Sequence, residues 1–305
     1  DRAAAALAAR FGRPSAVADD VPASPTPLRP RRTVARADDV PLEATGVTVR
    51  YGGLTAVNDV SIVVRPNEIV GIMGPNGAGK TTLFDVLSGQ QRPTSGTVRL
   101  HGVDVTGIPP HRRARMGLGR SFQQARLFED LTLLDAVQVA LEHEQPSRSS
   151  LSVLGLPGAR RRDDRRRATA ATLLCDLGLE EHLDRRVAEL STGTRRMAEL
   201  ACVTALGADV LLLDEPAAGF NLHETAVFAD VIRRLRDEHG LTIVVIDHDV
   251  PMMRDLVDRL YVLATGRVIA EGTPDVLSSD AGVLEAYMGV VPEGTDAKLA
   301  TLSVP

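Results

Sequence analysis

The sequence predicts an α/β fold in which strands and helices alternate around a helical insertion. Three observations lead to this prediction. Short apolar runs at 210–213 and 243–246 have the length of buried strands. A Gly-rich turn separates another apolar run from "TTLFDVLSG", whose apolar residues follow helical spacing. Between about 122 and 190 the pattern becomes mostly helical, and strand signals then return. One core interrupted by a helical subdomain accounts for all three.

Residues 1–41 are expected to form a tail or linker, because they are rich in Ala, Arg and Pro without a sustained period. They contain no apolar run of about 7–15 residues, which excludes a secretory signal there. The first residue is Asp rather than Met. The sequence therefore starts either inside a longer gene product or after trimming or processing.

The folded part is predicted to span 42–290, with 291–305 as a C-terminal tail. Its first strands are "GVTVRY", "VSIVV" and "EIVGIMG", and "GTVRL" follows a turn. Helical segments come next, "LTLLDAVQVALEHE" behind Thr132 as N-cap and then "RATAATLLCDLGL". The strands "VLLLDE", "LTIVVIDHD" and "RLYVLATGRVIAEG" complete the pattern.

The composition is that of a globular protein, with 44% hydrophobic and 25% charged residues. No run approaches the ~18 apolar residues of a membrane span. The net charge of −5 argues against a nucleic-acid-binding domain. The basic stretch "RRRDDRRR" contains two Asp and no aromatic residue, which favours a solvated or partner-facing helix start. Cys175 and Cys202 lack metal-ligand spacing and fit a reducing compartment.

The sharpest motif is "GPNGAGKTT", which fits the phosphate-loop pattern G-x-x-x-x-G-K-[ST] and lies between a predicted strand and a predicted helix. Gly74, Gly77 and Gly79 allow the backbone to fold tightly and direct its N–H groups at phosphate, next to the positive N-terminus of the helix. Lys80 is placed to reach the β/γ oxygens, and the Thr81 hydroxyl to bind Mg²⁺. The chain has 35 basic residues but only two Lys, one of them here.

Two further strand ends carry chemical groups. "VLLLDEP" ends with Asp214, which we expect to hold Mg²⁺, and Glu215, which we expect to polarise the attacking water. "IVVIDHD" places His248 after another strand, where it is expected to contact the γ-phosphate.

In motif order and spacing, the chain resembles the ATP-binding cassette (ABC) ATPases over about residues 42–290. In "YGGLTAVNDVS", Tyr51 corresponds to the residue that stacks on adenine, and in "RSFQQ", Gln123 corresponds to the Q-loop residue that reaches Mg²⁺ and water. "ELSTGTRR" occupies the place of the ABC signature and "PAAGFN" that of the D-loop. The resemblance implies a RecA-like P-loop core, an antiparallel β subdomain and an α-helical subdomain at about 122–190.

The resemblance implies an ATPase that binds ATP and Mg²⁺. The expected catalytic residues are Glu215, His248 and Gln123, and the expected metal ligands are Thr81, Gln123 and Asp214. The expected nucleotide contacts are Tyr51, Val57, Gly74, Asn76, Gly77, Ala78, Gly79, Lys80, Thr81, Thr82, Ser191 and Gly193.

The signature departs from the family's LSGGQ, because residues 190–194 read LSTGT. Ser191 and Gly193 keep the hydroxyl and N–H that would meet the γ-phosphate bound by the opposite subunit. Thr192 adds a branched side chain, and Thr194 lacks the Gln amide. We expect a weakened but working half-site, and a tolerated variant and a functional adaptation both fit the change.

The helical insert, "DEPAAGFNLHET" and the end "GRVIAEGTPDVL…VLEAYMG" resemble ATPase subunits of branched-chain amino-acid importers. This implies uptake of those or related small solutes. The expected partners are a second cassette, identical or different, a permease, separate or fused, and a solute-binding protein. The expected location is the cytoplasmic face of the plasma (inner) membrane, held peripherally by the permease.

Two other classes compete with this reading. A non-transport ABC ATPase acting on DNA or ribosomes usually carries a coiled-coil insertion or a second cassette, and the sequence has neither heptads nor a second phosphate loop. A P-loop kinase or GTPase-like switch explains Lys80 and Asp214 but leaves Gln123, Ser191 and His248 without a role.

Overall fold

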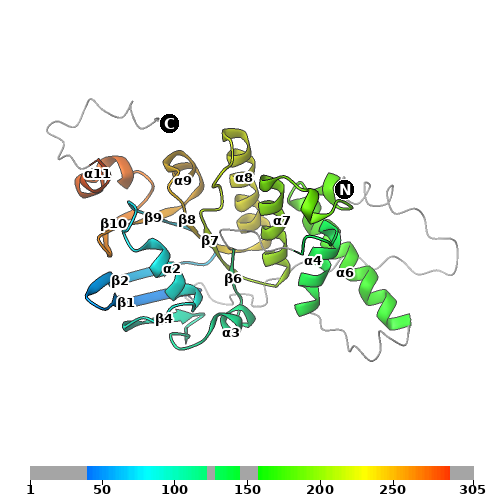
Figure 1. The fold of residues 1–305 in the computed structure, drawn as a ribbon, viewed down its shortest axis with the longest axis horizontal. Helices are drawn as coiled ribbons and strands as arrows, with labels where there is room; N and C mark the ends of the chain where they lie inside the picture. Colours follow the sequence, from blue (N-terminus) through cyan, green and yellow to red (C-terminus); the bar gives the residue numbers. More distant parts are fainter. Residues whose placement is uncertain (1–39, 122–127, 145–156, 289–305) are drawn as a thin grey trace. The chain divides into compact units, whose positions relative to one another are not determined.

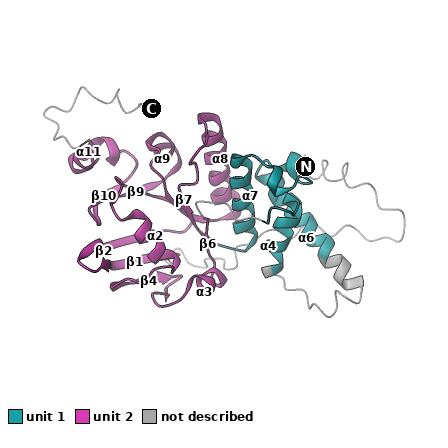
Figure 2. Ribbon diagram, in the orientation of Figure 1, with its two compact units in different colours: residues 1–31, 124–208 teal, residues 32–123, 209–305 magenta. Residues whose placement is uncertain are grey.

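A computed structural model describes residues 40–121, 128–144 and 157–288, without the side chains of 143–144, 157–162 and 287–288 (Figure 1). These residues form two compact units, coloured separately in Figure 2. One contains 128–144 and 157–208, and the other contains 40–121 and 209–288. Gln123 and most of both predicted tails lie outside the described residues.

The larger unit contains a six-stranded sheet in the order β10-β9-β3-β8-β7-β6. Its strands are β3 (Ile69–Met73), β6 (Leu118–Arg120), β7 (Val210–Asp214), β8 (Thr242–Ile246), β9 (Arg259–Ala264) and β10 (Arg267–Gly272). All pairs are parallel except β9 with β10. Every residue of β3, β7 and β8 is buried, as expected for the middle of a covered parallel sheet. The carboxyl ends of these three strands therefore meet at one edge, where α/β proteins bind ligands.

The same unit has an antiparallel sheet in the order β2-β1-β4-β5. Its strands are β1 (Leu42–Tyr51), β2 (Leu54–Val64), β4 (Ser95–Leu100) and β5 (Val103–Asp104). β1 and β2 are longer than the sequence predicted, because irregular register lets pairing continue past Gly46 and Asp59, both at positive φ. Helix α2 (Lys80–Ser88) packs against strands of both sheets, and its buried Leu83, Phe84 and Leu87 belong to their shared apolar core.

The remaining helices of this unit are α3 (Pro110–Arg115), α8 (Leu222–His239), α9 (Val250–Leu256), α10 (Val276–Ser279) and α11 (Ala281–Met288). α8 begins at a capping box, in which the Asn221 side chain accepts from the Glu224 N–H and the Glu224 carboxylate accepts from the Asn221 N–H. α8 thus starts at the end of the predicted D-loop, and two residues close in sequence supply the hydrogen bonds that cap its first turn.

The smaller unit is helical, with α4 (Leu133–Glu144), α6 (Pro157–Asp176) and α7 (Thr192–Ala205) packed on one another. Thr132 accepts from the Asp135 N–H at the start of α4, which confirms it as an N-cap. Short 3₁₀ turns at 180–182 and 187–189 lead to α7. The sequence predicts that the helical segment ends near residue 190. α7 begins after that point and still belongs to this unit. No helix within the described ranges is long and apolar enough to cross a membrane.

Arg113 on α3 is a buried cation that donates hydrogen bonds to the C-terminal end of α2. The residue is only 1% exposed, and its guanidinium donates to the carbonyls of Val86 and Leu87 at 2.8 and 2.7 Å. It also donates to the Ile108 carbonyl at 2.9 Å. Burial lowers the pKa of Arg113 to about 10, and the charge of Asp104 partly offsets this. Arg113 thus supplies donors to carbonyls that a helix end leaves without helical partners.

We expect Arg113→Met to lower the free energy of unfolding by about 3 kcal/mol, because several buried carbonyls lose their donor. The neighbouring Arg112 is exposed, so Arg112→Met is the matched control and is expected to change stability by less than about 0.5 kcal/mol. Urea unfolding of both variants measures the difference. Equal unfolding midpoints would show that the carbonyl contacts of Arg113 contribute nothing.

Candidate functional site

The predicted phosphate loop connects β3 to α2, and two of its glycines are required by crowding. A Cβ on Gly74 (φ +153°) would overlap the Leu263 carbonyl oxygen, and a Cβ on Gly79 (φ +99°) would overlap that of Ala56. Gly77 (φ +81°) has no atom within 4 Å of a Cβ position, so its side of the loop is open. The loop therefore packs against β9 and β2 on one side, and its other side, at Gly77, is accessible.

The front of the loop carries backbone donors. Gly79 is the N-cap of α2 and offers no side chain to the first N–H groups of the helix, which have no acceptor within the helix. Thr81 is exposed and Thr82 half-buried in that first turn, and Asn76 is exposed in the loop. Ala78 is buried and donates its N–H to the Pro75 carbonyl at 3.1 Å. Free N–H groups and a positive helix end make this an anion-binding geometry.

Lys80 lies over the same loop. Its ammonium donates to the carbonyls of Gly74 at 2.7 Å and Pro75 at 3.0 Å, and the residue is 9% exposed. Burial lowers the pKa of Lys80, while the negative charges of Glu215 and Asp214 oppose that shift. The structure thus brings the loop lysine within electrostatic reach of both predicted carboxylates.

Asp214 ends β7 and is 2% exposed. Burial raises the pKa of its carboxyl, although the guanidinium of Arg120 acts in the opposite direction. Arg120, at the end of β6, donates to Asp214 Oδ2 at 3.3 Å and to Asp85 and Ser88 at 2.7 Å. It also lies over the Phe84 ring, 5.1 Å from the ring centroid. Our sequence analysis did not find Arg120, whose only signal is its place just before the predicted Q-loop.

Glu215 adopts φ +45°, which is rare for a residue with a side chain. Its N–H donates to the Ile246 carbonyl at 2.8 Å, which ties this conformation to the end of β8. Its carboxylate Oε1 lies 3.9 Å from Nδ1 of His248, whose side chain is 70% exposed. The structure therefore brings Glu215 and His248 together at neighbouring strand ends, as expected if they serve one site.

Asp247 is a second residue that the sequence analysis missed. It is 2% exposed, and its Oδ1 accepts from the N–H groups of His248 at 2.7 Å and Asp249 at 3.0 Å. Its Oδ2 is buried without a hydrogen-bond partner among the described residues. Oδ1 of Asp247 thereby fixes the backbone turn that carries His248 away from β8.

Two of the expected nucleotide contacts, Tyr51 and Val57, lie on the antiparallel sheet. Tyr51 ends β1 and is 49% exposed, so its ring is available for stacking. Val57 is fully buried in β2, and one of its methyl groups would lie 3.4 Å from a Cβ on Gly79. The phosphate loop and β2 are thus in contact.

Ser191 and Gly193 lie in the helical unit. Ser191 is the N-cap of α7, and its hydroxyl accepts from the Thr194 N–H at 3.1 Å and lies 2.9 Å from the Thr194 hydroxyl. Gly193 is in the first turn of α7. The unusual Thr194 of the signature therefore contacts the side chain of Ser191, which the sequence alone did not indicate.

The oxygen donors present suit Mg²⁺. Asp214 provides a carboxylate and Thr81 a hydroxyl, and Mg²⁺ in phosphate sites takes one or two protein ligands together with water and phosphate oxygens. Within the described residues, no group of three or more His, Cys, Asp or Glu is arranged to hold a metal. The hydroxyl of Thr81 and the carboxylate of Asp214 thus fit an ion whose other ligands are water and phosphate oxygens.

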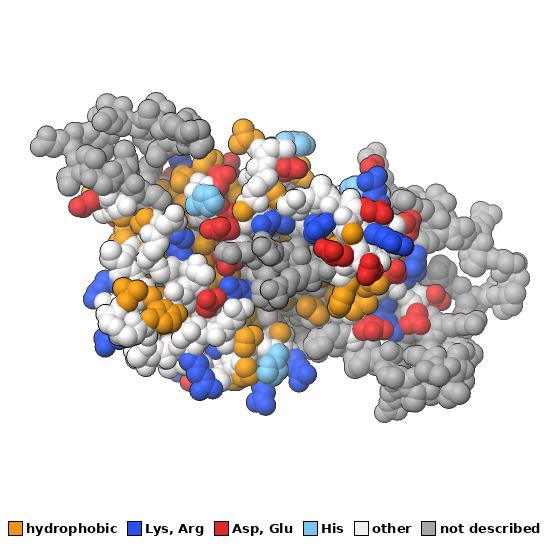
Figure 3. Space-filling model, in the orientation of Figure 1, with side chains coloured by type: hydrophobic (Ala, Val, Ile, Leu, Met, Phe, Trp, Pro, Cys, Tyr) orange, Lys and Arg blue, Asp and Glu red, His pale blue; other side chains and the backbone are white. Residues whose placement is uncertain are grey.

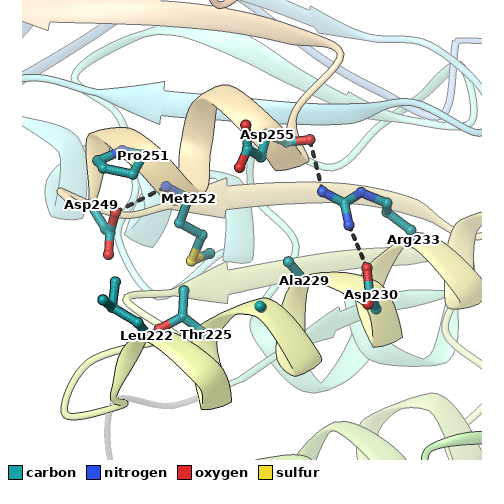
Figure 4. Close-up of a pocket in the computed structure, with 10 residues that line it drawn as sticks. Leu222, Thr225, Ala229, Asp230, Arg233, Asp249, Pro251, Met252 and Asp255 are labelled. Carbon is teal, nitrogen blue, oxygen red and sulfur yellow. Dashed lines mark hydrogen bonds and ion pairs between the residues drawn. The ribbon is translucent and has the colours of Figure 1, made fainter.

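On the face in Figure 3, basic and acidic side chains are mixed, with basic ones along the lower edge by α3. Figure 4 shows a pocket between α8 and α9, where Arg233 donates to Asp230 at 2.6 Å and to the Asp255 carbonyl at 3.0 Å. None of the predicted site residues lines this pocket.

Comparison with known families gives two matches. The family described as "ABC transporter" matches residues 57–218, and "Branched-chain amino acid ATP-binding cassette transporter" matches residues 267–292. The first match spans the phosphate loop and both carboxylates. The second begins at β10 and continues through the C-terminal helices.

Curated relatives and solved structures agree with these matches. The chain is 41% identical over 249 residues to the high-affinity branched-chain amino acid transport ATP-binding protein LivG of Salmonella typhimurium, covering 81% of this chain and 97% of that protein. It is 37% identical over 248 residues to BraF of Pseudomonas aeruginosa, a protein of the same description, with the same coverage. It is similar to the ADP conformation of MJ1267, an ATP-binding cassette of an ABC transporter, with a TM-score of 0.69, 27% identity and coverage of 83% and 99% of the two chains.

Proposed function

This chain belongs to the ABC transporter family of ATPases, and on that premise we propose that it powers uptake of branched-chain amino acids or closely related solutes. As an ABC ATPase it binds and hydrolyses ATP. The substrate class is inferred from relatives named for branched-chain amino acid transport and from the matching C-terminal segment. No observation in the described residues favours the alternative, an ABC ATPase acting on DNA or ribosomes.

One observation carries the proposed site: Lys80, Asp214 and Glu215 meet at the carboxyl edge of the parallel sheet. Burial lowers the pKa of Lys80, and the two carboxylates are close enough to oppose that lowering. That lysine lies over a loop of N–H donors that opens away from the sheet. Anion donors, a cation and two carboxylates in one place are the parts that phosphoryl transfer needs.

We assign the roles as follows. The loop N–H groups and Lys80 bind the β- and γ-phosphates, with further contacts from the exposed Asn76, Thr81 and Thr82. Tyr51 stacks on the base. A Mg²⁺ ion held by Thr81 and Asp214 would neutralise charge on the triphosphate. Gln123, predicted as a further Mg²⁺ and water contact, lies outside the described residues and keeps that role as a prediction.

In the hydrolysis step, Glu215 acts as general base. It accepts a proton from a water molecule as the water oxygen bonds to the γ-phosphorus and the bond to the ADP oxygen breaks. The left-handed backbone at Glu215 directs its side chain out of the strand line, next to His248. His248 contacts the γ-phosphate, and Asp247 holds the turn on which it sits.

We further propose that two cassettes enclose each ATP. ABC ATPases of transporters pair as dimers with membrane permease subunits, and the second cassette here is an identical or a different chain. Ser191 and Gly193, at the N-terminus of α7, would face the γ-phosphate bound by the other cassette. ATP then stabilises the closed pair, and loss of the γ-phosphate releases it. The chain is membrane-associated through its permease, and we place it on the cytoplasmic face, with a solute-binding protein as a further partner.

The test is solute uptake in the organism that encodes the chain. We expect a chromosomal Glu215→Gln substitution to abolish uptake of radiolabelled leucine, isoleucine and valine at low concentration, without affecting uptake of a basic amino acid. Glu238→Gln, an exposed change of the same chemistry on α8, is the control and is expected to leave uptake unchanged. Unaltered branched-chain uptake, with another solute lost instead, would contradict the substrate assignment.

A further inference from the structure

The turn between β9 and β10 touches the back of the phosphate loop. At its tip, Gly266 donates its N–H to the carbonyl of Ala78 at 3.0 Å. Ala78 belongs to the loop and is 2% exposed, so the bond is shielded from water. This is a direct link from the loop to a turn nearly 190 residues further along the chain, and the sequence motifs do not include it.

The same glycine also contacts β2. The Asn58 N–H on β2 donates to the Gly266 carbonyl at 2.7 Å. Turned with its amide oxygen toward Arg267, the Asn58 side chain accepts from that guanidinium at 2.6 and 3.1 Å. One peptide unit on each side of Gly266 is therefore held, one by the phosphate loop and the other by β2.

Gly266 cannot be replaced without disturbing this packing. Its φ of +77° disfavours side chains, and a Cβ would lie 2.8 Å from the Ala56 carbonyl oxygen. A Cβ on Gly79 would overlap the same oxygen. The carbonyl of Ala56 thus lies close to both a phosphate-loop glycine and the turn glycine.

We propose that the β9–β10 turn is a positioning element for the nucleotide site, and that Gly266 is the residue through which it sets the phosphate loop against β2. The proposal rests on the phosphate loop being the nucleotide site. It assigns Gly266 no contact with the nucleotide. Its effect is on where the loop N–H groups point, and hydrogen bonds to a ligand weaken steeply when their angles change.

The test compares Gly266→Ala with Gly102→Ala. Gly102 lies in the β4–β5 turn at φ +74° and has no atom within 4 Å of a Cβ position, so its substitution carries the same backbone strain without the contact. Calorimetric titration with ATP and with inorganic pyrophosphate measures affinity on folded protein. We expect Gly266→Ala to weaken both ligands at least about tenfold relative to Gly102→Ala. A purely structural role would lower stability without this loss.

Equal affinities of the two variants, with wild-type protein binding ATP, would overturn this inference alone. A wild-type chain that does not bind ATP would overturn the proposed function as well. If Gly266→Ala does not fold, hydrogen exchange of the Gly266 amide in the unsubstituted chain provides the second test. We expect pyrophosphate with Mg²⁺ to slow that exchange, and an unchanged exchange rate would contradict the proposal.

Discussion

Replacing Glu215 with Gln is expected to lower the rate of ATP hydrolysis at least about a hundredfold, the lower end of what a general base contributes. Gln keeps the size of the side chain and its proximity to His248 but cannot accept the proton of the attacking water. ATP is still expected to bind, because Lys80 and the loop N–H groups are unaltered. Phosphate release and nucleotide affinity, measured on the same preparation, separate the two effects.

Glu238→Gln removes one carboxylate from the exposed side of α8 and is the matched control for charge. We expect its hydrolysis rate to equal that of the wild-type chain. If Glu215→Gln turned over at a near wild-type rate, Glu215 would not be the base. Reduced ATP affinity in the same variant would instead assign it to binding.

Lys80→Ala is expected to weaken ATP binding about a hundredfold, the equivalent of one strong charge-assisted contact. The ammonium group is the one buried cation over the phosphate loop among the described residues, and its loss removes a positive charge that interacts with both Asp214 and Glu215. Equilibrium titration with ATP measures the effect, and Arg99→Ala, an exposed change on β4, is the control. Unaltered affinity in Lys80→Ala would contradict the assignment.

The Lys80 ammonium also bonds the carbonyls of Gly74 and Pro75, so its removal affects the loop itself. Urea unfolding of Lys80→Ala is therefore measured beside the titration. A variant that is as stable as the Arg99 control but does not bind ATP assigns the loss to the phosphate contact.

The parts of the site that lie at strand ends were predictable from sequence. Each buried strand is a short apolar run, and the one or two residues after that run must lie near the sheet edge, which locates Asp214 and His248 without knowledge of their neighbours. The same holds for the N-cap Thr132, because a cap is a local interaction between residues three apart. Local periodicity and local capping are physical signals that the sequence carries.

The missed residues depend on partners far away in sequence. Arg120 reaches Asp214 across 94 positions, and Arg113 reaches Leu87 across 26. An Arg in a chain this rich in Arg carries no signal of its own, and only the folded sheet shows which one is buried. Gly266 is one of 26 glycines, and its role appears only when the Ala78 carbonyl is seen beside it.

The central claim is that this chain hydrolyses ATP at sites shared by two cassettes. The measurement that tests it most directly is the Mg²⁺-dependent rate of phosphate release per molecule, taken over a range of protein concentrations with Glu215→Gln alongside. We predict a rate per molecule that rises with concentration and is absent in the variant. A substantial rate that does not depend on concentration and persists in Glu215→Gln would contradict the account.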